Sequence, residues 1–94
     1  MVKVVAQSTL VGDKVTEAIS LYEELVAETR KEAGCIKYEL YQDEKDPAIL
    51  TMIEEWEDRE ALDRHMKTLH FLKIVPMVDK FKVDGQLHIY HKVI

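Results

Sequence analysis

The sequence predicts an α+β fold with the element order β-α-β-β-α-β and one antiparallel sheet. Apolar and polar residues alternate in four segments, as in half-buried strands. Two longer segments repeat apolar residues at intervals of three and four, which is typical of amphipathic helices. Turn and cap residues such as Gly12, Gly34 and Asp58 separate these segments. This order matches the ferredoxin-like split βαβ unit, in which both helices cover one face of the sheet.

The first strand and first helix follow from the N-terminal third of the chain. Residues 2–10 alternate, with one clean apolar face and one mixed face that carries Gln7. Asp13 is the expected N-cap of a helix whose apolar spacing runs through residues 15–29. Gly34 is the expected C-terminal stop, because a left-handed conformation there is free of steric cost for glycine.

The remaining elements follow in the same way. Residues 35–41 and 49–56 alternate on either side of a polar turn, which predicts a hairpin of the second and third strands. Asp58 is expected to cap the second helix. The helical pattern continues beyond it, but Pro76 lacks a backbone donor, so we expect a kink or restart there. Residues 86–94 are predicted to form the fourth strand.

Composition favours one ordered domain spanning residues 1–94. Apolar residues make up 47% of the chain and charged residues 33%, with only three Gly and two Pro. The net charge of −5, with Lys and Arg interleaved among acidic residues, argues against nucleic-acid binding. The apolar runs are too short for a membrane span, and the N-terminus lacks the basic stretch and apolar core of a signal peptide. We therefore expect a cytoplasmic location. The single cysteine, Cys35, cannot form an internal disulfide and is read as a small buried hydrophobe.

The sheet face that the helices leave open also needs cover. Its predicted residues, such as Val5, are too apolar to sit comfortably in water. Packing against the sheet of a second copy would bury them, and a domain of this size gains stability from such burial. We therefore expect a homodimer whose two sheets form a barrel with a cavity.

The chain resembles the antibiotic biosynthesis monooxygenase (ABM) family of dimeric α/β-barrel proteins, especially its small quinol-monooxygenase-like members. The resemblance covers nearly the whole chain and rests on three short patterns: Gly34-Cys35 with Tyr38, Glu55-Trp56-Glu57, and His65 with Thr68 and His70-Phe71. The family includes monooxygenases of phenolic or quinol substrates, haem-degrading enzymes and an isomerase of a signalling sugar phosphate. Where haem-degrading members carry Asn, Trp and a ligating His, this sequence has Gln7, His65 and Val75, so haem degradation is not expected.

His65 is the candidate base. It occupies a position of helical spacing that an aliphatic core residue would normally fill, and the pKa of histidine lies near neutrality. The resemblance implies catalysis without metal, flavin or haem, because an electron-rich phenolate or quinol anion can itself pass an electron to O2. The alternative is a core histidine bonded to a carbonyl or carboxylate.

Three further residues are candidates for substrate binding. Trp56 can wall a cavity or anchor the second helix by burial, and Tyr38 can donate a hydrogen bond into the cavity or simply pack at its rim. Gln7 can orient a substrate oxygen or face solvent. The acidic pairs Glu54-Glu55 and Glu57-Asp58 are interpreted as a solvated strand end and the first turn of a helix.

No metal site is predicted. His70 follows His65 by five positions, so a continuous helix would separate the two by roughly 140° around its axis. His88 and His91 fall on opposite faces of a strand, and no His-Glu-x-x-His or Cys-x-x-Cys spacing is present.

The leading hypothesis is a homodimeric, cofactor-independent monooxygenase of a quinol or polyphenol-like aromatic, with His65 as the base. One alternative is an isomerase of a small carbonyl compound, in which His65 would shuttle a proton. Another is a non-catalytic dimer that binds a small ligand or a protein. The sequence does not select the substrate, because specificity depends on cavity shape.

Overall fold

The computed structural model describes all residues from Met1 to Ile94. Four strands and three α-helices follow the predicted order, except that the second helix is split in two. The elements are β1 (Val2–Leu10), a 3-10 turn η1 (Gly12–Lys14), α1 (Val15–Thr29), β2 (Cys35–Gln42), β3 (Ile49–Trp56), α2 (Arg59–His65), α3 (Leu69–Asp79) and β4 (Lys82–His91).

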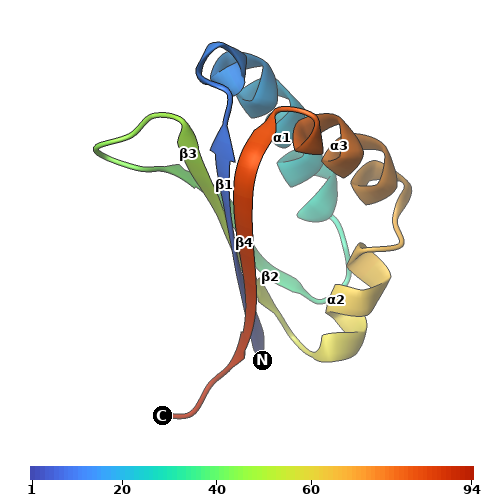
Figure 1. The fold of residues 1–94 in the computed structure, drawn as a ribbon. Coiled ribbons are helices and arrows are strands. Elements are labelled where there is room, and N and C mark those ends of the chain that lie inside the picture. Colours follow the sequence, from blue (N-terminus) through green and yellow to red (C-terminus); the bar gives the residue numbers. More distant parts are fainter.

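The four strands form one antiparallel sheet in the order β2-β3-β1-β4. All three α-helices lie over one face of this sheet, and the other face is left open (Figure 1). The α+β, ferredoxin-like fold is therefore confirmed. No helix has the length and apolar character needed to cross a lipid bilayer.

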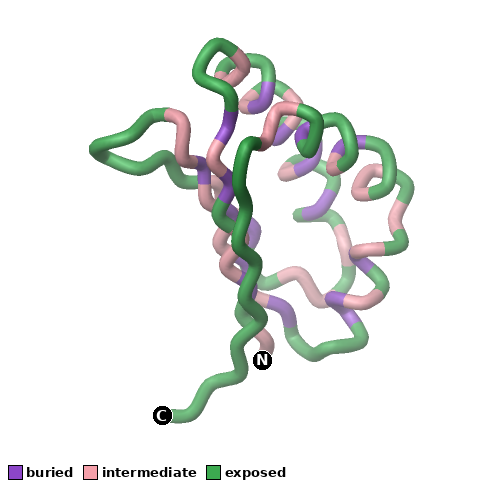
Figure 2. The backbone as a smooth tube through the Cα atoms, in the orientation of Figure 1, coloured by how far each residue is buried: buried purple, intermediate pink, exposed green.

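The core lies between the helices and the covered sheet face. Alternation along β3 brings every second side chain, from Leu50 to Trp56, to this face, and Trp56 is fully buried there. The buried residues of the sheet lie mainly on β1 and β3, whereas β4 and the C-terminal residues are exposed almost throughout (Figure 2). The core residues are Val4, Leu10, Ala18, Tyr22, Leu25, Tyr38, Leu50, Met52, Trp56, Ala61, Leu62, Ile74 and Val78.

Two expectations about helix ends prove wrong in detail. Asp13 lies within η1, and α1 begins at Val15 without any side-chain cap. The α1 helix ends at Thr29, five residues before Gly34, because a further turn intervenes. Gly34 does adopt the left-handed conformation, with φ of 86°.

Gly34 also fixes the spacing between the strand layer and α2. A Cβ atom at this position would lie 2.6 Å from the Cβ of Ala61, well inside van der Waals contact. Its carbonyl accepts a 2.9 Å hydrogen bond from the Glu57 amide, which joins the start of β2 to the segment before α2. Glycine is required here both for its backbone conformation and for this close approach.

The fourth strand is displaced from its prediction. It runs from Lys82 to His91 rather than from residue 86 to 94. Pairing with β1 determines these limits, since Val2 pairs with His91 and Leu10 with Lys82. Residues 92–94, which the sequence predicts to continue the strand, have no partner strand within the chain.

Candidate functional site

His65 ends helix α2 and is almost completely buried, with 1% of its surface exposed. The helix begins as predicted, because the Asp58 carboxylate accepts a 2.8 Å hydrogen bond from the Ala61 amide. Ala61 and Leu62 are buried on the inner face of α2, and His65 follows on the same face one turn later. The cap and the apolar spacing together direct the imidazole towards the sheet.

The helix stops at His65, and three residues, 66–68, separate it from the start of α3 at Leu69. The Thr68 hydroxyl donates to the His65 carbonyl (2.7 Å) and accepts from the Phe71 amide (3.3 Å), so it closes one helix and caps the next. The restart expected at Pro76 does not occur, because α3 runs through it. The interruption turns His70 back towards His65, and the predicted 140° separation of the two rings is wrong.

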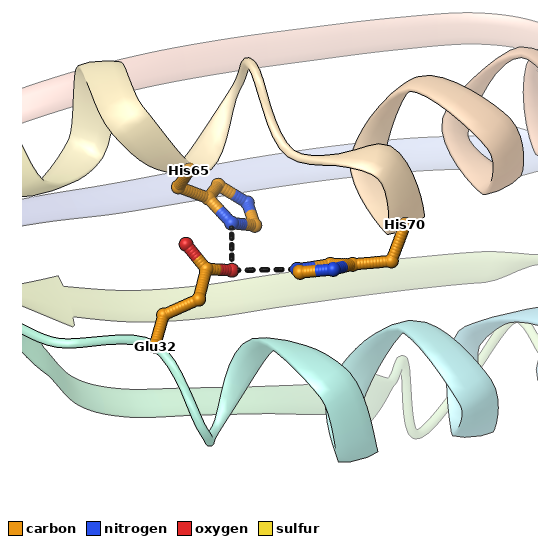
Figure 3. Close-up of side chains that lie close together, drawn as sticks. All are labelled: Glu32, His65 and His70. Atoms are coloured by element: carbon orange, nitrogen blue, oxygen red, sulfur yellow. Dashed lines mark hydrogen bonds and ion pairs between the residues drawn. The ribbon is translucent and has the colours of Figure 1, made fainter.

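The two histidines meet on one carboxylate oxygen, contributed by Glu32 from the turn after α1. The Nδ1 atom of His65 lies 2.8 Å from Glu32 Oε2, and the Nε2 atom of His70 lies 2.7 Å from the same oxygen (Figure 3). A carboxylate accepts from both rings, so the proton of neutral His65 belongs on Nδ1. Its Nε2 atom is buried and has no hydrogen-bond partner in the chain. This atom is available as a base.

Burial and the triad act on His65 in opposite directions. Desolvation lowers the pKa of His65, while the hydrogen bond and the charge of Glu32 raise it. The net effect is a lowered pKa, which favours the neutral ring at pH 7. Proton uptake at Nε2 would then create a cation next to the Glu32 carboxylate, which stabilises it.

Three aromatic rings surround the imidazole. The ring centroid of His65 lies 4.6 Å from that of Trp56, 5.0 Å from Phe71 and 5.2 Å from Tyr38. The structure thus brings together three of the four residues predicted for the site. Gln7 lies elsewhere: it pairs with Thr51 and Gln86 on the open face of the sheet, opposite the helices.

Glu54 is a site residue that the sequence reading missed. Its acidic neighbour indicates a solvated strand end, yet only 6% of the surface of Glu54 is exposed. Its Oε1 atom accepts a 2.9 Å hydrogen bond from Trp56 Nε1. Burial raises the pKa of Glu54 to about 7, against the opposing effect of the Trp56 hydrogen bond, and the nearby Glu32 charge raises it further. Strict alternation with Met52 and Trp56 was the available signal, because it placed Glu54 on the buried face.

A cavity of about 100 Å³ lies between the sheet and the helices. Tyr38, Glu54 and Phe71 are part of its lining, whereas His65 lies behind the rings of Tyr38 and Phe71. Burial raises the pKa of Tyr38, with the Glu54 charge as the second cause, so its hydroxyl remains a donor. A larger groove of about 340 Å³ between α1 and β2 is open to solvent and includes neither His65 nor Glu54. The smaller, partly open cavity is the one next to the ionisable groups.

Glu32, His65 and His70 also form a donor set that transition metals accept. Their ligand atoms lie within 4.8 Å of one another. Two ligands on a tetrahedral zinc, each about 2.0–2.1 Å from the ion, stand about 3.3 Å apart. The observed separations of 2.7 and 2.8 Å are those of hydrogen bonds. The geometry is that of a hydrogen-bonded triad, and an ion would have to widen it.

The fold and site define a small α+β protein with a histidine and a carboxylate buried among aromatic rings. The chain belongs to the antibiotic biosynthesis monooxygenase family, which it matches over residues 1–77. This confirms the resemblance drawn from the sequence.

Solved structures agree with this assignment. A protein from Methanosarcina mazei Go1 is 40% identical with a TM-score of 0.95, and the match covers 98% of this chain and 92% of that one. A structure described as an antibiotic biosynthesis monooxygenase is also 40% identical, with a TM-score of 0.94 over 99% of both chains.

A protein of Synechocystis sp., described as uncharacterized, is 38% identical over 63 residues, or 67% of this chain. The matched region spans 43% of that protein's length.

Proposed function

We propose that this protein is a cofactor-independent monooxygenase that oxidises a quinol or polyphenol-like aromatic with O2, with His65 as the base. One observation carries the proposal: His65 is buried, its Nδ1 is held by Glu32, and its Nε2 has no partner. Family membership supports the class of reaction, since one similar structure is described as a monooxygenase. The same pairing of an imidazole with a carboxylate orients general bases in other enzymes.

The reaction begins with removal of a hydroxyl proton by His65 Nε2. The resulting aromatic anion is electron-rich enough to pass an electron to O2 directly. For a hydroquinone the balance is complete: hydroquinone and O2 give a hydroxyquinone and water. One oxygen atom joins the ring, and the other leaves as water with two hydrogens from the substrate. No external reductant is required.

The surrounding side chains serve this chemistry by position. Tyr38 lines the cavity, where a planar substrate can pack against its ring and its hydroxyl can donate to a substrate oxygen. Trp56 is fully buried and does not line this cavity; its ring packs 4.6 Å from that of His65 and holds the imidazole in place. Exclusion of water strengthens the attraction between the Glu32 carboxylate and protonated His65. The ring of Phe71, which lies against His65 and lines the cavity, has to rotate for the substrate to reach Nε2.

A homodimer is part of the proposal. Apolar side chains of β4 and the chain end have no cover within the protomer, and a second copy would bury them. They are Val83, Tyr90, Val93 and Ile94; Leu87 and Ile89 are also exposed, but they pair with Ala6 and Val4 and so lie on the helix side of the edge strand. Gln7 lies on the open sheet face, where the two sheets would meet, so its proposed contact with substrate requires the barrel to form. Sedimentation equilibrium tests the dimer, and a monomer at micromolar concentration would refute it.

Oxygen uptake by the metal-free protein tests the reaction, against a panel of reduced quinones and polyphenols with an autoxidation control. His65→Ala should abolish protein-dependent uptake, because general-base catalysis contributes about 10²–10⁴-fold. His91→Ala is the matched control, since His91 is exposed at the end of β4 and pairs with Val2, off the open face that carries Gln7. Uptake that persists in folded His65→Ala would refute the role of His65. Turnover that needs no air would instead indicate the isomerase, and ligand binding without turnover the non-catalytic dimer.

A further inference from the structure

Glu54 is a buried carboxylate without a cation. It lies in the middle of the sheet, beside Val4 of β1 and Tyr38 of β2. No Lys, Arg or His side chain forms an ion pair with it. Trp56 occupies Oε1, and Oε2 has no hydrogen-bond partner in the chain. Oε2 is not among the fully buried atoms that lack a partner, so a donor in the adjoining cavity can reach it.

The cavity beside Glu54 limits a ligand to one aromatic ring at most. Nine of its twelve lining residues are hydrophobic, and its volume is about 100 Å³. An apolar cavity of about 150 Å³ holds a benzene molecule, so the cavity beside Glu54 can take one ring only if a lining side chain such as Phe71 moves, and a fused pair of rings is too large. Lys82 also lines the cavity, but its Nζ atom is paired with Asp79 at 2.7 Å. The hydroxyls of Ser8, Tyr22 and Tyr38 also line the cavity, but Glu54 is its one carboxylate and so the strongest acceptor for a ligand hydroxyl.

We propose that Glu54 binds the hydroxyl group of a single-ring phenol or hydroquinone in this cavity. The inference deepens the proposed function, on which it rests for turnover, by narrowing the substrate to one ring. The ligand O–H donates to Glu54 Oε2 while Trp56 keeps the carboxylate in place through Oε1. The apolar lining receives the ring faces. Glu54 selects ligands by their donor, and the cavity selects them by size.

The protonation state of Glu54 supports this role. Because its pKa is raised to about 7, near neutral pH the group is ready to lose its proton when a donor arrives. A phenol O–H stabilises the carboxylate, so binding should release a proton and strengthen between pH 6 and pH 8. The titratable or charged groups on the elements around Glu54 are Glu32, His65, Tyr22, Tyr38 and Lys82.

Anaerobic titration calorimetry on the full chain tests the inference, because without O2 binding is measured apart from turnover. The ligands are phenol and hydroquinone, with toluene as the ring that lacks a donor and 1,4-naphthalenediol as the larger diol. Wild-type protein should bind phenol at least about 10-fold more tightly than toluene, the scale of one hydrogen bond to a charged group. The naphthalenediol should bind at least about 10-fold more weakly than hydroquinone.

Variants then assign the effect to Glu54. Glu54→Leu should lose about 10-fold or more in phenol affinity and keep its affinity for toluene, while Glu54→Gln, which retains an acceptor, should fall between. Glu55→Gln makes the same chemical change on the opposite sheet face and should bind phenol like wild type. Circular dichroism confirms that each variant is folded. If Glu54→Leu does not fold, the phenol affinities of Glu54→Gln and Glu55→Gln are compared, and equal affinities overturn the role of Glu54.

The outcomes separate this inference from the proposed function. Equal phenol affinity in wild type and Glu54→Leu, or equal affinity of wild type for phenol and toluene, overturns the role of Glu54. Naphthalenediol binding as tight as that of hydroquinone overturns the single-ring limit. Glu54-dependent phenol binding without any protein-dependent oxygen uptake would support the site while refuting the monooxygenase.

Discussion

Replacing Glu54 by Gln should stabilise the protein increasingly as the pH rises. The pKa of Glu54 is about 7 in the fold, against 4.5 for an exposed glutamate. Between these two pH values the folded protein keeps the Glu54 proton that the unfolded chain releases. The contribution of this proton to the free energy of unfolding is therefore fully present below pH 4.5 and is lost as the pH rises through 7. A difference of about 2.5 units at about 1.36 kcal/mol each amounts to about 3 kcal/mol. Glutamine cannot ionise and escapes this loss.

Urea unfolding at pH 5 and pH 8 measures the effect. Far-ultraviolet circular dichroism is the signal, because Trp56 contacts Glu54 directly and its fluorescence would respond to the substitution itself. The free energy of unfolding of Glu54→Gln, relative to wild type, should rise by about 2 to 3 kcal/mol between the two pH values. Both proteins must be compared at one concentration, since dimerisation would add to stability. The dependence of the free energy on urea should be equal in both.

Glu55→Gln is the matched control for this experiment. Glu55 is the next residue of β3, but it lies on the open face of the sheet, 3.6 Å from Lys37. It reports any general effect of removing a negative charge from the strand. If the Glu54→Gln difference changes by less than about 1 kcal/mol between pH 5 and pH 8, the desolvation argument for Glu54 is wrong.

Three further substitutions test separate features of the structure. Gly34→Ala should cost about 3 kcal/mol in urea unfolding, because it adds left-handed strain and a clash with Ala61, and a loss below about 1 kcal/mol would contradict both. Glu32→Gln should lower kcat for oxygen uptake by about 100-fold or more, because His65 loses its charged partner; unchanged kcat would exclude this role. Thr68→Ala should lower stability by about 1 kcal/mol through the lost α3 cap, and identical unfolding curves would argue against the cap.

The strands could be predicted well because their signal is local. Alternation located β1 and β3 with correct limits, and Asp58 identified the start of α2. The continuation of α3 through Pro76 was harder to anticipate. Pro76 lies inside a continuous helix, with buried Ile74 and Val78 on either side of it holding both halves against the core. Tertiary packing here outweighs the preference of one residue.

The site was predictable only in part, for a different physical reason. His65, Trp56 and Tyr38 carried signals of burial or family resemblance in their own segments. Glu32 carried none, because its meeting with His65 depends on a turn 33 positions earlier in the chain. The convergence of His65 and His70 depends on a helix break that has neither glycine nor proline to announce it. Contacts between distant segments are not encoded in the spacing within either one.

The gap between α2 and α3 sets the relative rotation of the two histidines. Each residue of a helix turns its side chain by 100°, so removing or adding one residue at positions 66–68 would swing the His70 ring away from Glu32 without altering any of the three triad residues. The length of this short connection is thus as much a component of the site as the side chains themselves. A variant with all three triad residues but a different connection length would keep the residues of the site and lose their geometry.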